Sequence, residues 1–234
     1  MAAQINQLSN GRFLLGLGAG WHEPEHVRFG IPFPPLRERF DRLEEAINVI
    51  KTLWGPGPAS YKGKHYQVEY VDCLPKPVYG ADTPILIGGS GEKRTLPLVA
   101  KYADEWNAVN VPLNLYQHKV DVLEAACAAV DRDPATVHRS RMSMAFVAGD
   151  QLSLDRMTRW HMSLSGATGS PAEYRKDKAK NNNFLGGLTS ELVDTLGKFA
   201  DMGVEEVQFE HFNFGSDEWP EYLAREIAPA AAAF

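Results

Sequence analysis

Residues 84–107 read PILIGGSGEKRTLPLVAKYADEWN, and this stretch contains the pattern that decides the fold. The apolar run 83–87 predicts a buried strand that ends in the glycine-rich residues 88–91. A short helix is predicted from about Glu92 to Tyr102, and another buried strand over residues 105–111. A strand, a crossover helix and a second strand form a βαβ unit, so the two strands are expected to lie in a parallel sheet.

The glycine-rich loop in this stretch predicts an anion-binding site. Successive glycines at the end of a strand, just before a helix, expose backbone N–H groups and the positive end of the helix dipole. Lys93 and Arg94 add local positive charge. The loop is not a Walker A motif, because no Gly-Lys-Ser/Thr follows at the required spacing. A plain β–α turn is the alternative interpretation.

The same alternation of strand and helix continues on both sides of this stretch. Further buried strands are predicted over residues 12–18, 142–147 and 204–212, and further helices over 35–54, 115–130, 190–202 and 219–227. These five strand–helix units predict an α/β fold with a parallel sheet, either doubly wound or part of a (β/α) barrel. In both architectures the functional groups gather at the carboxyl ends of the strands.

Two segments fall outside this alternation. Residues 59–72 alternate aromatic and polar side chains around a glycine, which predicts a β-hairpin. Residues 163–187 are polar and rich in glycine and asparagine, which predicts a long loop with at most a short helix. Because this second segment has no pattern that forms a core, it is also predicted to be a mobile lid.

Residues 16–26 read GLGAGWHEPEH and allow three interpretations. The pattern H-E-x-x-H binds zinc when both histidines share one helical face, but Pro24 fits only the first turn of a helix, so His22 would precede that helix. A dinucleotide fingerprint would need a glycine at the position of Trp21. The remaining interpretation is a glycine-lined strand end that approaches a ligand, or a tight turn alone. Its glycines are Gly16, Gly18 and Gly20.

Composition narrows the class of protein. The chain has 234 residues, 44% of them hydrophobic and 23% charged, which suits one or two globular domains with an apolar core. A net charge of −6 argues against nucleic acid and anionic membranes as partners. Cys73 and Cys127 fit neither a disulfide framework nor a metal site, which predicts a cytoplasmic setting. No apolar run approaches the length that spans a membrane, so no membrane is expected as a partner.

Three blocks of the chain, taken in order, resemble the luciferase-like monooxygenase superfamily. They are GRFLLGLGAGW at residues 11–21, PPLRERFDRLEEAINVIKTLW at 34–54 and the stretch 84–107. The resemblance covers residues 5–227 and is closest to the oxidoreductases that depend on coenzyme F420. It implies a single domain over residues 1–234 with the fold of a (β/α)8 TIM barrel, often dimeric, that holds F420 or FMN at the carboxyl ends of its strands. The implied activity is hydride transfer between F420 and a small organic substrate, with an FMN-dependent monooxygenase as the alternative.

The resemblance also implies which residues bind the cofactor. Its phosphate would lie against Gly88, Gly89, Ser90 and Gly91. The ring or ribityl region would be lined by Gly18, Gly20 and Trp21, with Asn107 and Asn110 at the next strand end. No catalytic acid or base is assigned, and the candidates are His22 and His211, which both lie near strand ends. No residue is expected to bind a metal.

The chain departs from the family pattern in its length. Family members begin with three further β/α units, and none precedes Phe13, so the five predicted strands correspond to strands four to eight of the family barrel. The chain is then a fragment, a split-gene product or a shortened relative, and a catalytically silent flavin- or deazaflavin-binding protein is an alternative function. Open strand edges and an uncovered apolar face predict a homodimer or a partner chain that supplies the missing strands.

Overall fold

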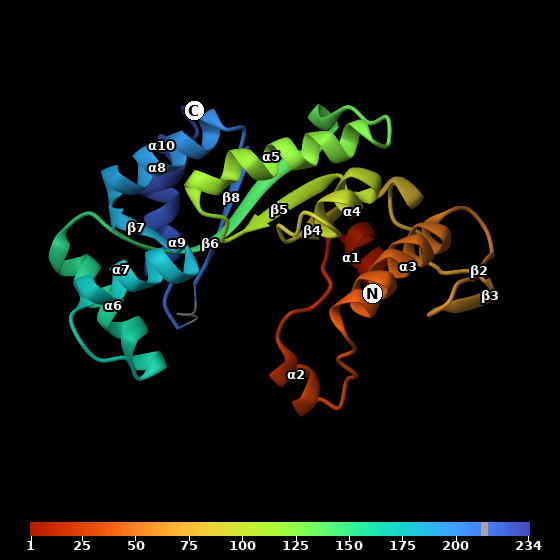
Figure 1. Ribbon diagram of the computed structural model, residues 1–234, viewed down its shortest axis with the longest axis horizontal. Helices are drawn as coiled ribbons and strands as arrows, with labels where there is room; N and C mark the ends of the chain where they lie inside the picture. The colour runs from red at the N-terminus through yellow and green to blue at the C-terminus, as the bar shows by residue number, and fades with distance from the viewer. Residues whose placement is uncertain (212–214) are drawn as a thin grey trace. The chain divides into compact units, whose positions relative to one another are not determined.

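The computed structural model describes residues 1–211 and 215–234 (Figure 1). The chain forms two compact units, and each is described by itself. Unit 1 contains Met1–Trp106 and Val122–His138, and unit 2 contains Asn107–Asp121 and Arg139–Phe234. Three elements contribute residues to both units, namely β5 (Glu105–Val109), α5 (Leu113–Ala128) and, through its first residue alone, β6 (His138–Ala148).

Unit 1 contains the predicted βαβ segment. Strand β4 (Ile85–Gly88) is followed by α4 (Thr95–Tyr102) and then by β5. Strand β1 (Leu15–Leu17) pairs in parallel with β4, with Leu17 opposite Ile87, and the strand order is β1-β4-β5. The predicted parallel arrangement is therefore confirmed for this part of the chain.

The remaining elements of unit 1 surround these strands. Its other helices are α1 (Ala2–Leu8), α2 (Glu23–Arg28), α3 (Leu36–Trp54) and the short 3-10 turns Gly80–Asp82 and Pro134–Thr136. The core is apolar, and its fully buried side chains include Ile47, Ile85, Ile87, Val99 and Trp106. Helix α3 buries Leu43, Ile47 and Trp54 along one face, as its sequence pattern predicts.

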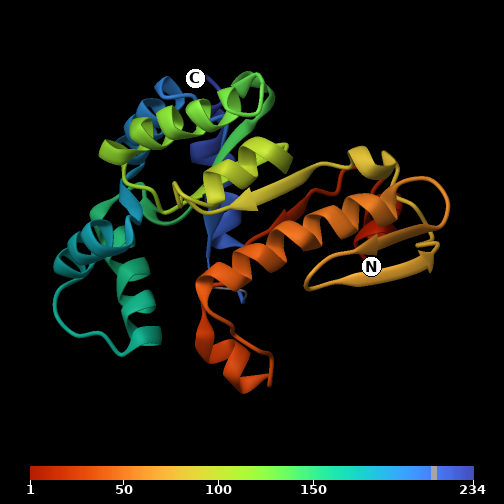
Figure 2. The same cartoon turned by 45° about the vertical axis from the view of Figure 1, so that its right-hand side comes forward.

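The predicted hairpin is present as β2 (Ala59–Lys62) and β3 (Gln67–Val71), which pair in antiparallel fashion beside α3 (Figure 2). Glu45 on α3 binds its turn, because the carboxylate accepts hydrogen bonds from the backbone N–H groups of residues 64, 65 and 66 at 2.8–3.1 Å. These three hydrogen bonds lower the pKa of Glu45, although its partial burial opposes them as the largest single effect. The hairpin is thus held to α3 by one ionised side chain.

Unit 2 is organised around the long strand β6 (His138–Ala148). The first half of β6 pairs in parallel with β8 (Glu206–Glu210), and its second half pairs in parallel with β7 (Leu185–Leu188). The helices of this unit are α6 (Gln151–Ser165), α7 (Pro171–Asn182), α8 (Thr189–Asp201), α9 (Glu218–Tyr222), the π-helical turn Leu223–Ile227 and α10 (Ala228–Ala231). Two apolar clusters of unit 2 pack against β6, one with α8 and α9 and the other with α6 and α7.

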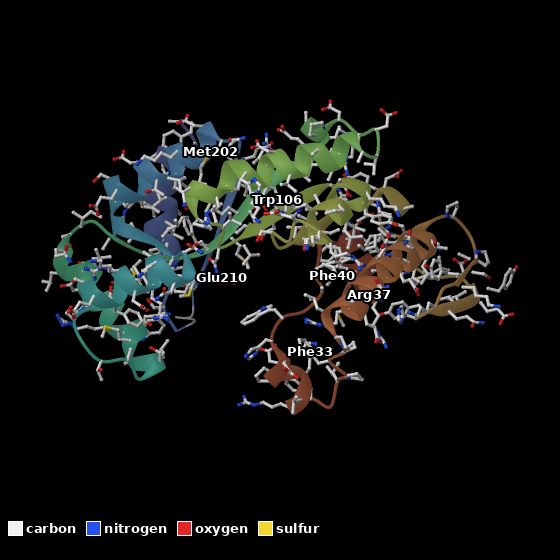
Figure 3. The ribbon with its side chains drawn as sticks, in the orientation of Figure 1. Phe33, Arg37, Phe40, Trp106, Met202 and Glu210 are labelled. Carbon is white, nitrogen blue, oxygen red and sulfur yellow. The ribbon has the colours of Figure 1, made fainter. Side chains whose placement is uncertain are left out.

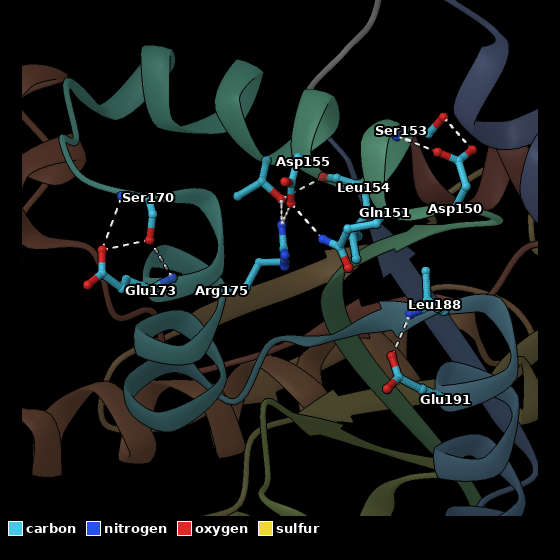
Figure 4. Close-up of polar contacts among 11 residues, drawn as sticks. Asp150, Gln151, Ser153, Leu154, Asp155, Ser170, Glu173, Arg175, Leu188 and Glu191 are labelled. Carbon is cyan, nitrogen blue, oxygen red and sulfur yellow. Dashed lines mark hydrogen bonds and ion pairs between the residues drawn. The ribbon is translucent and has the colours of Figure 1, made fainter.

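The prediction that residues 163–187 form a long loop is wrong, because most of this segment is α7 and β7. Ser170 caps α7 in a capping box with Glu173, and Pro171 occupies the first helical position (Figure 4). Arg175 joins α7 to α6 through Asp155, at 2.8 Å. From α7, Tyr174 packs into the apolar cluster on β6. The mobility of this segment stays a prediction.

Several predicted boundaries also differ from the structure. Helix α4 begins at Thr95 and not at Glu92. The final strand, predicted over 204–212, is found at Glu206–Glu210, and Phe212 lies outside the described residues. Helix α6 was not predicted, although Asp150 caps it by accepting a hydrogen bond from the N–H group of Ser153 at 2.9 Å (Figure 4).

Candidate functional site

The candidate site of unit 1 lies where β1 and β4 end side by side. The parallel register sets Leu17 opposite Ile87, so Gly18 and Gly88 follow at neighbouring positions. A methyl group added at Gly18 would lie 4.0 Å from the carbonyl oxygen of Gly88, an ordinary contact distance. The structure therefore brings together the two glycine segments that the sequence marked as cofactor-binding.

The loop after β4 is held in place by a buried tryptophan. The indole Nε1 of Trp106 donates a hydrogen bond of 2.7 Å to the carbonyl oxygen of Gly89, and Trp106 is fully buried (Figure 3). Gly89 has φ +117°, a conformation that L-residues rarely adopt. The Trp106 contact, which ties β5 to the loop, was not predicted from the sequence.

The same loop passes close to the beginning of α4. A side chain at Gly91 would begin 3.0 Å from the hydroxyl oxygen of Thr95, and a side chain at Gly89 would begin 3.4 Å from the methyl group of Thr95. The N–H group of Leu96 donates to the carbonyl oxygen of Gly91 at 3.0 Å. Gly91 therefore eases a tight approach of the loop to the first turn of α4, and at Gly89 the positive φ favours glycine.

The two cations beside the loop have different surroundings. Arg94 forms an ion pair with Asp41 on α3 at 2.8 Å, with both side chains about one-third exposed. This hydrogen bond from Arg94 is the main reason why the pKa of Asp41 is lowered. The ion pair of Arg94 thus joins the start of α4 to α3. Lys93 is exposed and can turn its ammonium group toward an anion at the loop.

The strand end after β1 is fixed by an arginine on α3. Arg39 donates to the carbonyl oxygens of Ala19 and Gly20, and its guanidinium carbon lies 3.9 Å from the centre of the Phe33 ring. Gly20 has φ +74°, so a glycine suits this turn. Trp21, which follows, is 85% exposed. Trp21, which was predicted to line the ring of the cofactor, is therefore mostly exposed in unit 1.

His22 lies next to this strand end and caps α2. Helix α2 begins at Glu23 with Pro24 in its first turn, as predicted, so His22 precedes the helix. The ring of His22 lies 3.3 Å from a carboxylate oxygen of Glu25, and the ring of His26 hydrogen-bonds to the backbone carbonyl of His22. In the described residues, no group of three histidine, cysteine or acidic side chains has metal-binding geometry.

The remaining candidate residues belong to unit 2. Asn107 is buried, and its amide nitrogen donates to Ser140 at 2.8 Å and to Gln208 at 3.2 Å. The N–H group of Asn110 donates to the carbonyl oxygen of Met142 at 3.0 Å, and its side-chain oxygen is buried without a hydrogen-bond partner in the described chain. His211 follows β8 and lines a cavity of unit 2. The buried network of Asn107 was not predicted from the sequence.

Parallel strands with crossover helices and glycine-lined carboxyl ends define an α/β protein of the (β/α)-barrel class. The chain belongs to the luciferase-like monooxygenase family, whose model matches residues 1–203. The predicted family and the predicted partial TIM barrel are thus confirmed. No helix in the described ranges has both the length and the apolar character needed to cross a membrane.

Curated relatives include pyrimidine monooxygenases. The chain is 30% identical to pyrimidine monooxygenase RutA of Stutzerimonas stutzeri over 174 residues, which cover 71% of this chain and 46% of the relative. It is 36% identical to the protein of the same name from Serratia proteamaculans over 107 residues, 44% of this chain and 28% of the relative. The chain thus spans about half the length, or less, of these relatives.

Solved structures share the fold at low sequence identity. An F420-dependent secondary alcohol dehydrogenase in complex with an F420–acetone adduct gives a TM-score of 0.74 at 21% identity, covering 98% of this chain and 73% of that one. EDTA monooxygenase from Chelativorans gives 0.75 at 14% identity, covering 99% and 70%. An FMN complex of a Baeyer–Villiger monooxygenase from Pseudomonas putida gives 0.69 at 17% identity, covering 97% and 74%. At these identities the likeness establishes the fold alone.

Proposed function

We propose that the chain is the cofactor-holding part of an oxidoreductase, with the cofactor phosphate bound by residues 88–91. The observation that carries this proposal is the glycine loop between β4 and α4, where Gly89 has φ +117° and a side chain at Gly91 would begin 3.0 Å from the hydroxyl oxygen of Thr95. Backbone N–H groups, the hydroxyl of Ser90 and the start of a helix are donors that suit phosphate oxygens. The donor set of this loop therefore fits the phosphate of FMN or F420.

The other residues would bind and orient the rest of the cofactor. Gly18 and Gly20 allow close approach at the end of β1, and the exposed face of Trp21 offers a surface for a flat ring. His22 is the candidate of unit 1 for proton transfer. Asn107, Asn110 and His211 belong to unit 2, and the roles expected for them stay predictions. When bound, the cofactor would supply the redox chemistry, and the protein would supply orientation.

FMN is the cofactor that best matches the curated relatives, because they are named monooxygenases. Reduced flavins take part in oxygen chemistry as well as hydride transfer, whereas F420 serves as a hydride carrier. F420 remains the second candidate, favoured by the likeness of residues 85–96 to the F420-dependent branch. The proposed substrate is a small organic molecule, which an FMN enzyme would oxygenate and an F420 enzyme would oxidise or reduce.

A titration of the purified protein tests both cofactors. Absorbance and mass analysis of the protein as isolated identify any bound flavin or deazaflavin, and titration with FMN and with F420 then gives their relative affinities. Binding of neither cofactor would contradict the proposal. Binding without any oxidation of the reduced cofactor above its rate in buffer would favour the catalytically silent alternative.

A Gly89→Val variant is expected to bind the cofactor at least roughly tenfold more weakly, which is a loss of about 1.4 kcal/mol in binding free energy. The branched side chain would occupy the space in which the backbone approaches the phosphate, next to Thr95. Gly57→Val is the matched control, because Gly57 also has positive φ, +69°, and an added Cβ there meets no atom within 4 Å. Equal affinities in the two folded variants would show that the loop is not the phosphate site.

A second chain is the proposed partner of unit 1. In the described part of the chain, β1 pairs with β4 alone, which leaves its other edge open. Trp21, Val27 and Phe29 are each at least 70% exposed, and apolar side chains in this number rarely stay uncovered. We expect light scattering at micromolar concentration to give a mass above that of one chain. A monodisperse monomer would contradict this expectation.

A further inference from the structure

A cavity of about 520 Å³ lies entirely within unit 2. Its walls come from the end of β6, from α6, from the end of β8 and from the segment 218–225 around α9. The volume suits a small organic molecule. Of the residues predicted to form the cofactor site, His211 alone is among the described walls of this cavity.

The walls of this cavity are mainly aromatic and aliphatic. Phe146 on β6 is buried, Met157 and Trp160 come from α6, and Trp219 and Tyr222 come from α9. Flat aromatic surfaces of this kind favour a ring, which can stack on them or meet them edge to face. The apolar part of the ligand is therefore expected to be aromatic.

One buried donor in these walls has no acceptor among the described residues. Trp219 is 8% exposed, and its indole Nε1 makes no hydrogen bond within the described chain. A buried tryptophan normally finds an acceptor, and an unsatisfied buried donor is unfavourable. The second tryptophan of the cavity differs in this respect. Trp160 is more exposed, at 37%, and its Nε1 is not a buried unsatisfied atom. A carbonyl oxygen on the ligand could accept the hydrogen bond that Nε1 of Trp219 does not make within the described chain.

The charged residues that line the cavity disfavour an anionic ligand. Both lining arginines are paired with carboxylates, Arg156 with Glu218 at 3.8 Å and Arg225 with Glu226 at 2.7 Å. The carboxylates of Asp150, Glu210 and Glu221 add further negative charge to the lining. An anion would therefore meet an excess of like charge as it loses water.

A histidine in the wall adds an uncharged polar surface. The ring nitrogen Nδ1 of His161 lies 2.9 Å from the hydroxyl of Tyr174, and its ring packs edge-on against Phe146. Burial is the main cause that lowers the pKa of His161, and Lys178 lowers it further. The imidazole is therefore mostly neutral at neutral pH, which fits a pocket for an uncharged ligand.

We infer that this cavity binds an uncharged aromatic molecule that carries a carbonyl group, with the carbonyl oxygen accepting a hydrogen bond from Trp219. This inference does not rest on the proposed cofactor, since the ligand would bind to the protein alone. It can be true if the flavin titration fails, and it can fail if that titration succeeds.

Three probes of nearly equal size test the inference on the full chain without cofactor. They are acetophenone, which is neutral and has a carbonyl, benzoate, which is anionic, and ethylbenzene, which has no acceptor. Saturation-transfer NMR titrations are expected to give acetophenone at least roughly fivefold tighter binding than ethylbenzene and at least roughly tenfold tighter binding than benzoate. Equal binding of acetophenone and either other probe, or no binding of acetophenone, would overturn the inference.

Two conservative variants test whether the N–H group of Trp219 binds the carbonyl oxygen of the ligand. Trp219→Phe keeps an aromatic ring but removes the N–H group, so the preference for acetophenone over ethylbenzene is expected to disappear. Trp160→Phe makes the same chemical change in the same cavity and is expected to retain that preference. Circular dichroism confirms that each variant is folded. If Trp219→Phe fails to fold, Met157→Trp, which fills the cavity from α6, is expected to weaken acetophenone binding, and unchanged binding would overturn the inference.

Discussion

A Trp106→Phe variant is expected to lose about 2–3 kcal/mol of folding free energy and to bind the cofactor several-fold more weakly. Trp106 is fully buried and donates the 2.7 Å hydrogen bond to the carbonyl oxygen of Gly89. Phenylalanine would leave that carbonyl without its partner and would leave a void beside the loop. Urea unfolding measures the first effect, and cofactor titration measures the second.

The matched control for this prediction is Trp54→Phe. Trp54 is also buried, at 5% exposure, and it ends α3 in the same unit. Its replacement is expected to lower stability by packing alone and to leave cofactor affinity unchanged. If both variants lost affinity equally, the effect of Trp106 would be one of general stability and not of loop position.

The βαβ segment could be predicted because its apolar runs and glycines are local signals. The start of α4 could have been predicted as well, since Pro97 fits only the first turn of a helix. A helix that begins at Thr95 satisfies this requirement, whereas one that begins at Glu92 places the proline in its interior.

The segment 163–187 was misjudged because its helix lacks an apolar stripe. Helix α7 depends on the Ser170–Glu173 capping box, on the Arg175–Asp155 ion pair and on a single buried tyrosine. The first of these is a local signal that the sequence contains, Ser-Pro-Ala-Glu at residues 170–173. The ion pair joins two helices and could not be predicted without the fold.

The glycines of the candidate site could be predicted, but the contacts that hold them could not. Arg39 contacts Gly20 across 19 residues, and Asn107 contacts Gln208 across 101 residues. Sequence periodicity describes the faces of single elements, so it contains no information on which side chain of one element meets the backbone of another. These tertiary contacts decide which glycine carbonyl oxygens accept hydrogen bonds and which side chains of the site are buried.

Replacement of Arg141 in unit 2 is expected to have the second large effect. It should raise the free energy of unfolding, whereas replacement of Trp106 should lower it. The side chain is 1% exposed on β6, its Nη2 donates to the carbonyl oxygen of Asn183 at 3.3 Å, and its guanidinium carbon lies 4.5 Å from the centre of the Phe199 ring. Within the described residues it has no carboxylate partner, and its Nε and Nη1 have no acceptor. Burial lowers the pKa of Arg141 to about 10, so the folded state disfavours the charged form.

Because the pKa of this base is lower in the folded state, folding is opposed at neutral pH, and that cost would decline only as the pH rises through about 10. An Arg141→Met variant removes the charge and keeps an apolar chain of similar reach, so it is expected to be more stable by about 1–3 kcal/mol. Urea unfolding midpoints with unchanged slopes would measure this gain.

Arg132→Met is the control, because the guanidinium of Arg132 donates to the carbonyl oxygens of Ala100 and Ala103 at the end of α4. That variant is expected to be less stable, since a buried unpaired arginine and a helix-capping arginine contribute with opposite signs. If Arg141→Met were instead destabilised by more than about 1 kcal/mol, the hydrogen bond to Asn183 and the contact with Phe199 would outweigh the cost of burying the charge, and the prediction would be wrong.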